Sequence, residues 1–430
     1  MRRRVVVTGM GCVTPLGHDV ETMWAALLAG KSGISKTELF DSSTFPSTFS
    51  AQVKGFELPE PLAASGKHDH AGRHTRFALA AADQAWQASG LGASDALDPG
   101  RTGIYLGSGE GSLDFDNFTS LLVDAWSDEG GLDTVRWGEL AFERMHVDRE
   151  QEQEANMVVA HLAAQFGVRG PAFNILTACA ASTQAIGEAT MIIRHGDADA
   201  MISGGAHSMI HPYGLTGFNR LTALSRRNDD VATASRPFDL TRDGFVLGEG
   251  SSILILEDRE FALARGAKVL AEIIGFGSSA DAFRITDQDS AGEGASAAMR
   301  EALADAALSP SDIDYVSAHG TATKQNDQVE TRALKVVFGE LAGKVPVSSV
   351  KSMIGHLIAA AGATELITCV LAIRDQVLPP TTNLHTPDPD CDLDYVPNAP
   401  RKAKVRICMS NSFGFGGQND TLIITGAREA

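Results

Sequence analysis

The chain has 430 residues, almost three times the roughly 150 of a typical domain, which predicts two packed domains or one large duplicated α/β unit. Apolar residues make up 43% and charged residues 21%; these ordinary values exclude disorder, collagen-like repeats and a coiled coil as the main architecture. The 36 Lys and Arg against 54 Asp and Glu give a net charge of −18, so overall charge disfavours binding to nucleic acid or anionic lipid.

Cysteine usage and the first residues indicate a cytoplasmic protein. The five cysteines are an odd number, lie far apart and form no CxxC pair, so neither a disulfide framework nor a structural zinc site is indicated. Only Val5, Val6 and Val7 follow the basic start, far short of the apolar region of a signal peptide. No apolar run approaches the about 18 residues of a membrane span. We therefore expect a soluble chain in a reducing cytoplasm, with no metal, no membrane contact and no nucleic acid.

Segments typical of strands and of helices alternate along the whole chain, and glycines gather where strands turn into helices. The predicted strands are Val5 to Thr8, Thr102 to Gly107, Phe173 to Cys179, Ala200 to Gly204, Ser252 to Glu257, Leu270 to Gly277, Tyr315 to His319, Val345 to Val350, Ile407 to Asn411 and Thr421 to Thr425. The predicted helices are Ala71 to Ser89, Ser182 to His195, Gly292 to Ala307, Asp327 to Phe338 and Ile358 to Asp375. This alternation predicts an α/β fold.

The two halves of the chain resemble each other, which indicates a duplication. Thr102 to Gly107 is similar to Tyr315 to Gly320, and the strand and helix after Phe173 are similar to those after Val345. We place the halves at residues 1–258 and 259–430, so that equivalent loops of both halves converge at one site. The acidic stretch Asp124 to Glu154 fits neither half and is expected to be a helical surface insertion with a solvated charged face.

The turn that holds Cys179 is the first candidate for chemistry. An apolar strand runs into an Ala-rich helix at this point, which places the thiol at a helix N-terminus. Unpaired N–H groups and the helix dipole favour negative charge there by roughly 0.3 to 1 kcal/mol, so the helix alone is expected to lower the thiol pKa by about one unit. A lone cysteine is more often a small buried apolar residue. That interpretation is kept for Cys12, Cys369, Cys391 and Cys408.

Two histidines occupy similar settings in the second half. His319 ends a strand at Gly320, and His356 lies between a strand and an Ala-rich helix. Taken singly, each is more often a structural, hydrogen-bonded residue. The glycine-dense loop Asn411 to Asn419 follows another strand, and its backbone N–H groups could receive an oxyanion. A phosphate-binding Walker loop is disfavoured because no Lys-Ser/Thr follows.

These motifs, in this order, resemble the elongating β-ketoacyl-acyl carrier protein synthases, condensing enzymes of the thiolase-like fold with duplicated αβαβα layered halves. The resemblance covers nearly the whole chain. The motifs that carry it are Val5 to Gly11, the turn Thr177 to Ser182, Ser235 to Asp239, Arg242 to Gly250, His319-Gly320-Thr321, Lys351-Ser352 with Gly355-His356, and Gly414 to Gly417.

The resemblance implies an acyltransferase that needs no cofactor. An acyl chain passes from a carrier-protein thioester to Cys179 and is joined to the carbanion formed when malonyl-carrier protein loses CO2. His319 and His356 stabilise the developing oxyanion through Nε2, and the backbone N–H groups of Cys179 and Phe415 hold the tetrahedral oxygen. Lys351, paired with Glu330, is expected to fix the surroundings of the histidines.

The resemblance also implies the substrate contacts. Thr321 and Thr323 would bind the pantetheine arm, and Phe415 would act as a gate with Asp281 in the facing loop as its partner. Glu110 occupies a loop where an apolar residue commonly lines the acyl tunnel, and a buried carboxylate there would be costly unless paired or protonated. We therefore expect a shorter or more polar acyl pocket.

The expected partners are an acyl carrier protein and a second copy of the chain, with a related subunit as an alternative. Carrier proteins are acidic, so a local basic rim could dock one; the candidates are Lys67, Arg73, Arg76, Arg226 and Arg227. The segments Thr323 to Asp327 and Val347 to His356 also resemble type II polyketide ketosynthases, which keeps secondary metabolism open. Thiolases and initiating synthases are disfavoured by His356, and a non-catalytic chain-length subunit is disfavoured by Cys179.

Overall fold

The computed structural model describes residues 2–427. Its main feature is a ten-stranded mixed sheet with the strand order β12-β11-β15-β16-β10-β1-β9-β8-β4-β7. The first half contributes β1 (Val5–Val13), α3 (Arg73–Ser89), β4 (Thr102–Ser108), α7 (Met157–Phe166), β7 (Ala172–Ile175), α8 (Ala181–His195), β8 (Ala200–His207) and β9 (Gly250–Asp258). The second half contributes β10 (Ala271–Ala280), α11 (Glu293–Ala306), β11 (Tyr315–Ser317), α12 (Lys324–Phe338), β12 (Val347–Ser348), α14 (Ala361–Asp375), β15 (Ile407–Gly414) and β16 (Gln418–Gly426).

The order of elements and the order of strands repeat between the two halves. Each half runs strand, helix, strand, helix, strand, helix, strand, strand, and the sheet order is the same when read outward from the central pair β10 and β1. These two strands pair antiparallel, with Val5 opposite Ile273. The predicted duplication and α/β fold are confirmed, because chance would not give the same strand order on both sides of one seam.

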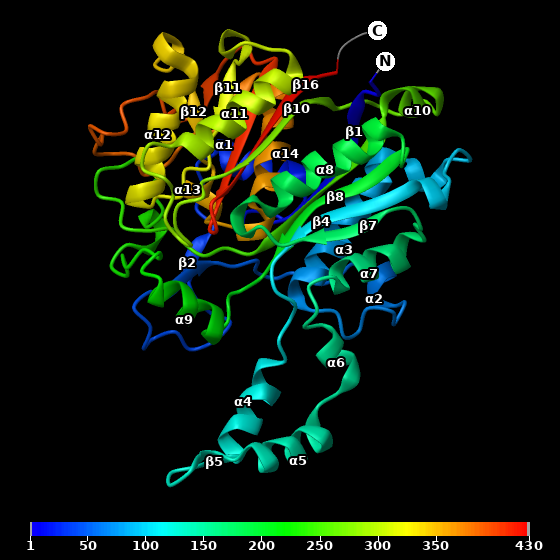
Figure 1. Ribbon diagram of the computed structural model, residues 1–430, viewed down its shortest axis with the longest axis vertical. Helices are drawn as coiled ribbons and strands as arrows, with labels where there is room; N and C mark the ends of the chain where they lie inside the picture. Colours follow the sequence, from blue (N-terminus) through cyan, green and yellow to red (C-terminus); the bar gives the residue numbers. More distant parts are fainter. Residues whose placement is uncertain (1, 428–430) are drawn as a thin grey trace.

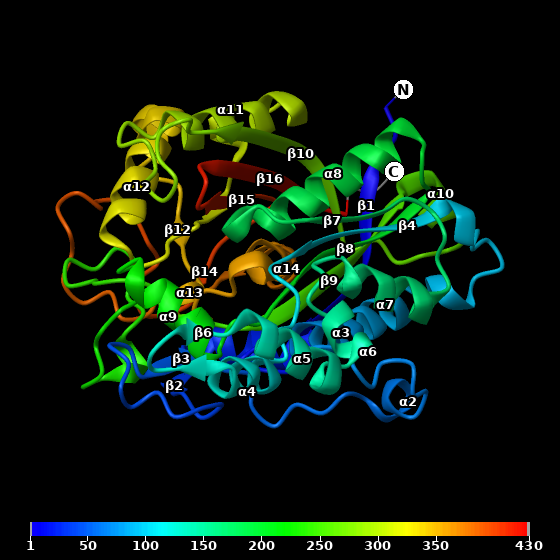
Figure 2. The same ribbon diagram turned by 60° about the horizontal axis from the view of Figure 1, so that its bottom comes forward.

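The sheet carries helices in three layers. Figure 2 shows α11 outside β10 and β16, α8 and α14 in the middle, and α3 and α7 outside β8 and β9. The middle layer is in contact with strands of both halves, so α14 is buried along Ala361–Ala372. Such a helix must be apolar on every side, which explains its Ala-, Leu- and Ile-rich sequence.

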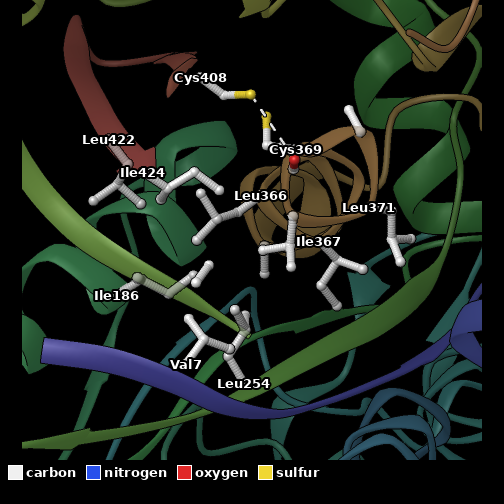
Figure 3. Packing of buried hydrophobic residues seen from close by; sticks show 14 of the residues in the cluster. Val7, Ile186, Leu254, Leu366, Ile367, Cys369, Leu371, Cys408, Leu422 and Ile424 are labelled. Atoms are coloured by element: carbon white, nitrogen blue, oxygen red, sulfur yellow. Dashed lines mark hydrogen bonds between the residues drawn. The ribbon is translucent and has the colours of Figure 1, made fainter. Parts of the chain in front are cut away.

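The main core surrounds α14. Figure 3 looks along this helix and shows Leu366 and Ile367 facing side chains of other elements, including Val7 of β1, Leu254 of β9 and Ile424 of β16. Complete burial of each such side chain stabilises the fold by about 1.5–3 kcal/mol. The core thus packs both halves against one central helix, and it fixes the N-terminal ends of α8 and α14 close to each other.

Several elements lie outside the repeat. Four short strands form the hairpin-like pairs β2–β3 and β13–β14. The elements are α1 (Val20–Leu28), β2 (Ile34–Lys36), β3 (Phe49–Ala51), α2 (Glu60–Ala63), α9 (Pro212–Arg220), α10 (Arg259–Ala264), α13 (Lys351–Ile354), β13 (Val377–Leu378) and β14 (Arg401–Lys402). None of the helices in residues 2–427 is both long and apolar enough to cross a membrane.

A lobe projects from the body between β4 and α7, at the bottom of Figure 1. It contains α4 (Phe115–Asp124), β5 (Trp126–Ser127), β6 (Gly131–Leu132), α5 (Thr134–Arg144) and α6 (Val147–Gln151). Leu121, Ala125, Leu140 and Ala141 form a small core of its own. The acidic stretch is therefore helical and superficial, but the lobe starts earlier, at residue 115, and it exposes apolar side chains as well as charges.

Most predicted elements are present, with different ends. The strand predicted over Phe173 to Cys179 ends at Ile175, and β1 continues five residues beyond the predicted Thr8. The helices α1, α2, α7, α9 and α10 were not predicted. These helices are either short or part of apolar segments without a clear helical period, so local pattern alone does not distinguish them from loops or strands.

Candidate active site

Cys179 lies in a 3₁₀ turn, Ala178–Ala180, between β7 and α8. Ala178 has a φ of 47°, a left-handed conformation that costs a non-glycine residue on the order of 1 to 3 kcal/mol. Gly414 of β15 lies against this turn: a Cβ built there would stand 2.8 Å from the carbonyl oxygen of Thr177 and 3.4 Å from the nitrogen of Cys179. The second half of the chain therefore approaches the nucleophile closely because residue 414 has no side chain.

Both predicted histidines reach Cys179 from the second half. His319 follows β11, and His356 follows α13 after Gly355, whose φ of 69° makes the turn. The Nε2 atom of His356 lies 2.9 Å from the sulfur of Cys179. The sulfur and one nitrogen of each ring all lie within 4.8 Å of one another, and all three side chains are buried. The structure brings both histidines to Cys179, although the sequence places them 140 and 177 positions after it.

Hydrogen bonds at Nδ1 fix the proton on the other nitrogen of each ring. The backbone N–H of Ile358 donates to Nδ1 of His356 over 3.3 Å, and the Lys351 ammonium lies 3.5 Å from Nδ1 of His319. Burial, followed by the positive charge of Lys351, lowers the pKa of both histidines well below the usual value. Neutral rings with an occupied Nδ1 carry hydrogen on Nε2. The site therefore presents two uncharged N–H donors beside the sulfur.

Cys179, His319 and His356 are also the one group with metal-ligand spacing in residues 2–427. A metal would need a lone pair on each ring nitrogen that faces it, whereas Nε2 of both rings bears hydrogen here. The ammonium of Lys351 beside His319 would also repel a cation. The arrangement suits an anionic oxygen rather than a metal ion.

The environment of the thiol differs from the sequence-based expectation. Burial raises the pKa of Cys179 to about 11, although the charge of Lys351 and the backbone N–H of Phe415 act in the opposite direction. The prediction of a lowered pKa was wrong because desolvation of a fully covered sulfur exceeds the effect of the helix N-terminus. The thiol is thus protonated at neutral pH, and its proton has to leave during the attack.

The predicted pair of Lys351 with Glu330 is also wrong. Lys351 forms a buried ion pair with Glu365 of α14. Glu330 instead accepts hydrogen bonds from the backbone N–H groups of His319, over 2.9 Å, and Gly320, over 2.8 Å. Burial raises the pKa of both carboxyl groups to about 7. Glu330 therefore holds the backbone of His319, while Glu365 holds the ammonium that faces its ring.

Glu365 was missed, although the sequence contains a signal for it. It is the one carboxylate in the interior of an otherwise apolar, Ala-rich helix, and a charged residue in a helix that is buried on every side needs a charged partner. The partner itself could not be identified from the sequence, since both Glu330 and Glu365 lie within reach of the same loop in the fold.

A cavity opens onto Cys179 and both histidines. Thr321 and Thr323 line it, as expected, and their hydroxyl groups are 3.0 Å apart. Phe415 also lines it and packs against the apolar side chains around Cys179. The complete lining is Cys179, Phe245, Thr286, Gln288, His319, Thr321, Thr323, Gln325, Asn326, His356, Phe413, Gly414 and Phe415.

Asp281 holds the loop of Phe415 through its backbone. Its N–H donates to the carbonyl of Gly417 over 2.8 Å, and its carboxylate accepts from Asn419 over 2.8 Å. The N–H of Gly416 donates to the carbonyl of Ile285 over 2.7 Å. Asp281 does not line the cavity, so it positions the two facing loops relative to each other.

Two other expectations were wrong. Glu110 is exposed and does not line the cavity, so no buried carboxylate has to be compensated. Burial lowers the pKa of His211, and the negative charge of Glu110 partly offsets this effect. Arg73 is not free to dock an acidic partner, because its guanidinium donates to both carboxylate oxygens of Glu249, over 2.8 and 2.6 Å.

Comparison with known proteins identifies the family. The sequence profile of the N-terminal domain of β-ketoacyl synthases matches residues 2–262, and that of their C-terminal domain matches residues 270–385. The chain belongs to the β-ketoacyl synthase family. It is therefore a condensing acyltransferase with the thiolase-like fold, as the motifs implied.

Curated relatives match over the full length. The chain is 44% identical over 428 residues to a protein of Coxiella burnetii named 3-oxoacyl-[acyl-carrier-protein] synthase 2, and the match covers 99% of each chain. A protein of the same name from Vibrio harveyi is 42% identical over 425 residues, which is 98% of each chain.

Solved ketosynthases share the architecture of this β-ketoacyl synthase. A β-ketoacyl synthase from Burkholderia phymatum superimposes with a TM-score of 0.88 at 33% identity, over 99% of this chain and 100% of the other. AntDE:AntF, a type II polyketide acyl carrier protein in complex with its ketosynthase bound to the hexaketide, gives a TM-score of 0.88 at 34% identity over all of both chains.

Proposed function

We propose that this β-ketoacyl synthase is an elongating 3-oxoacyl-[acyl-carrier-protein] synthase of the cytoplasm. It extends a Cys179-bound acyl chain by two carbons, using malonyl-carrier protein as the donor. The observation that carries the proposal is the pair of neutral N–H donors, from His319 and His356, beside one buried thiol. Relatives of this name at 44% and 42% identity support it.

The first step is acyl transfer. The Cys179 sulfur attacks the carbonyl carbon of the carrier thioester, and the negative charge that develops on the oxygen is held by the backbone N–H groups of Cys179 and Phe415. The bond to the arm sulfur then breaks, and the thiol proton of Cys179 goes to the departing arm thiolate. This transfer removes the difficulty of a thiol whose pKa is about 11, because no free thiolate has to accumulate.

The second step is decarboxylation and condensation. Breaking the C–C bond to the malonyl carboxylate releases CO2 and leaves the electron pair as an enolate of the thioester. The Nε2–H groups of His319 and His356 donate to the enolate oxygen, and no base is needed because no carbon-bound proton is removed. The carbanion attacks the acyl carbonyl, the bond to Cys179 breaks, and the sulfur leaves as a thiolate. One proton from water then restores the thiol of Cys179 for the next cycle.

The remaining site residues have supporting roles in this proposal. Lys351 and Glu330 fix the ring and backbone of His319, and Thr321 and Thr323 bind the carrier arm. Phe415 separates the two half-reactions by closing over the cavity. We assign Cys179 to the first half of the chain, residues 1–258, and both catalytic histidines to the second, residues 259–430.

We further infer that the enzyme works as a homodimer with an acyl carrier protein as its partner substrate. Strand β7 ends the sheet, so its outer edge has no partner strand within residues 2–427. Phe173 in β7 and Leu176 just after it are about half exposed, at 49% and 54%. An exposed apolar edge strand is a template for pairing with another chain. Antiparallel pairing of two copies of β7 would continue the sheet through the dimer.

Elongation in a polyketide pathway is the second candidate. AntDE:AntF, whose ketosynthase is bound to a hexaketide, covers this chain completely at 34% identity, and the ishigamide ketosynthase/chain length factor does so with a TM-score of 0.85. The higher identity, 44% and 42%, to proteins named 3-oxoacyl-[acyl-carrier-protein] synthase 2 favours the first candidate.

The test is reconstitution with a carrier protein. Wild-type enzyme given a saturated acyl-carrier protein and malonyl-carrier protein should yield a 3-oxoacyl product two carbons longer, seen by intact mass, and the Cys179→Ala variant should yield none. An enzyme that forms no acyl-Cys179 adduct would contradict the proposal. An enzyme that rejects saturated chains but extends poly-3-oxo chains would favour the polyketide candidate.

A further inference from the structure

The catalytic cavity has a wall of carboxamides that the mechanism above does not use. Gln288, Gln325 and Asn326 all line the cavity that opens onto Cys179. Asn326 is buried, and the Oε1 atom of Gln288 is fully covered without a hydrogen-bond partner among residues 2–427. A covered acceptor without a partner is unfavourable, and Gln288 lines the cavity, so a ligand that moves aside the atoms covering this oxygen can supply its partner.

The neighbours of Gln288 fix which way its side chain points. Buried Asp327 accepts from the backbone N–H of Ala322 over 3.3 Å and from Nδ2 of Asn326 over 3.1 Å. The amide oxygen of Asn326 is thereby turned toward Gln288, whose Nε2 donates to it over 3.1 Å. Since one end of the Gln288 carboxamide donates, the free end is its oxygen. The missing partner must therefore be a hydrogen-bond donor.

We propose that Gln288 binds the carrier arm by accepting a hydrogen bond from one of its amide N–H groups. This inference rests on the proposed function, which brings a pantetheine thioester into this cavity. Pantetheine carries two secondary amides, each with one N–H. A free oxygen that needs a donor matches such an amide, whereas a phosphate or carboxylate would bring only acceptors.

The same residue connects arm binding to the loops over the cavity. The backbone carbonyl of Gln288 accepts from Nε2 of Gln325 over 3.3 Å, and three residues earlier Ile285 accepts from the N–H of Gly416. The segment from Ile285 to Gln288 is thus held between α12 and the loop of Phe415. An arm bound to Gln288 would hold these two segments in place while Cys179 reacts.

The experiment compares two thioesters of the same acyl chain, octanoyl-pantetheine and S-ethyl thiooctanoate, which has no amide. The variants are Gln288→Leu, which keeps the size of the side chain, and Gln328→Leu as the control. Gln328 lies on α12, the helix that carries Gln325 and Asn326, but it binds Asp390 and does not line the cavity. The rate of Cys179 acylation is followed by intact mass at several thioester concentrations.

We expect Gln288→Leu to lower kcat/KM for octanoyl-pantetheine about three- to tenfold, the effect of one net hydrogen bond, mainly through KM. Its rate with S-ethyl thiooctanoate should equal that of the wild type, which also shows that the variant is folded. Equal loss with both thioesters, or no loss with octanoyl-pantetheine, would overturn the inference. If even the wild type were not acylated by either thioester, the proposed function itself would be wrong.

Discussion

The groups that bind Nδ1 of His319 and His356 determine that these two rings act as hydrogen-bond donors and not as bases in the proposed reaction. Each Nδ1 accepts, from the Ile358 backbone in one case and from Lys351 in the other, so each Nε2 carries hydrogen. A ring in that state cannot remove the thiol proton through Nε2. It can only donate, which fits a reaction that creates an enolate by loss of CO2.

Replacement of His319 should therefore separate the two half-reactions. We expect His319→Ala to slow decarboxylation of malonyl-carrier protein by about 100- to 1000-fold, the effect of one lost oxyanion donor. Acylation of Cys179 should remain within a few-fold of the wild type, since among residues 2–427 the histidine ring hydrogen-bonded to the sulfur is that of His356, not of His319. CO2 release and intact mass measure the two steps. Exposed His195 at the end of α8 provides the control His195→Ala, and a parallel loss of both steps in His319→Ala would contradict the assignment.

The buried ion pair of Lys351 and Glu365 should contribute to the free energy of unfolding. Removal of one partner leaves an uncompensated buried charge and typically costs about 3–5 kcal/mol. Lys351→Met and Glu365→Leu should each lower the free energy of unfolding by that order, and the double variant should lose less than the sum of the two. Denaturant titration of the four proteins measures this double-mutant cycle. Additive losses would show that the two side chains do not depend on each other.

The buried carboxyl group of Asp420 should make the free energy of unfolding depend on pH. It lies on β16 with both carboxylate oxygens buried and unpartnered among residues 2–427. Burial, with Glu188 and Glu301 acting in the same direction, raises its pKa to about 7. The folded state therefore keeps the proton longer than the unfolded state. The stability that this group contributes is complete below the unfolded pKa and is lost as the pH rises towards 7.

The variant Asp420→Asn should thus gain more at high pH. Its advantage over the wild type in free energy of unfolding should be larger at pH 8.5 than at pH 5, by at most about 3 kcal/mol, or about two pKa units. Urea titrations at the two pH values test this. Exposed Asp128 provides the control Asp128→Asn, which should change neither value. An advantage independent of pH would mean that Asp420 does not titrate between these values.

At the scale of elements, the two halves repeat one device. Ala178 and Ile358 both have left-handed φ angles, 47° and 46°, and each begins a 3₁₀ turn followed by a helix of 15 residues, α8 or α14. The two turns are in contact. The duplicated turn thus has two different uses. In the first half it carries the proposed nucleophile, Cys179, and in the second half it carries the N–H donor of Ile358 that orients His356.

The close approach of β15 to the turn that holds Cys179 should not tolerate a methyl group at residue 414. Gly414→Ala would place a Cβ 2.8 Å from the Thr177 carbonyl, so the turn and the loop of Phe415 have to separate. We expect a loss of Cys179 acylation by at least tenfold, an order-of-magnitude figure for a misplaced reacting group. Gly343→Ala, where a Cβ would meet nothing within 4 Å, is the control. Unchanged acylation in Gly414→Ala would show that this contact does not position the nucleophile.

At the scale of the whole molecule, two regions of the first half expose several large apolar side chains. One is the β7 edge with Phe173 and Leu176, and the other is the projecting lobe, where Phe142 is 97% exposed. Large exposed apolar groups are uncommon on monomers when they gather in this way. Both regions flank the first half of the sheet, the side that carries Cys179.

Dimer formation should therefore depend on Phe173. We expect Phe173→Glu to convert the proposed dimer to a monomer at micromolar concentration, because a charge would be buried at the pairing edge without a partner. Val336 on α12 is exposed to the same extent, 49%, and Val336→Glu is the matched control. Sedimentation velocity measures the mass of each. A Phe173→Glu protein that stays dimeric would place the interface elsewhere, with the lobe as the next region to test.

The sequence by itself determined the fold class, the duplication and the three residues, Cys179, His319 and His356, that meet at the proposed site. These features depend on local and repeated patterns: β-branched runs that end at glycines, Ala-rich helices after them, and motifs such as His319-Gly320-Thr321 that occur in one order. The family resemblance added the roles of the residues, which pattern alone could not assign.

Only the tertiary structure showed which ionisable groups of the site are paired, which are buried and in which direction their pKa values shift. Whether Lys351 pairs with Glu330 or Glu365, whether Glu110 is buried, and whether the pKa of Cys179 falls or rises all depend on distance and desolvation between segments far apart in the chain. A sequence records which groups can ionise, but burial and the nearest partner set the energy of each ionised form. Gln288 was missed for the same reason. Its side-chain oxygen can be assigned as the unpartnered end only from the hydrogen bonds of Asn326 to Asp327 and of Gln288 to Asn326.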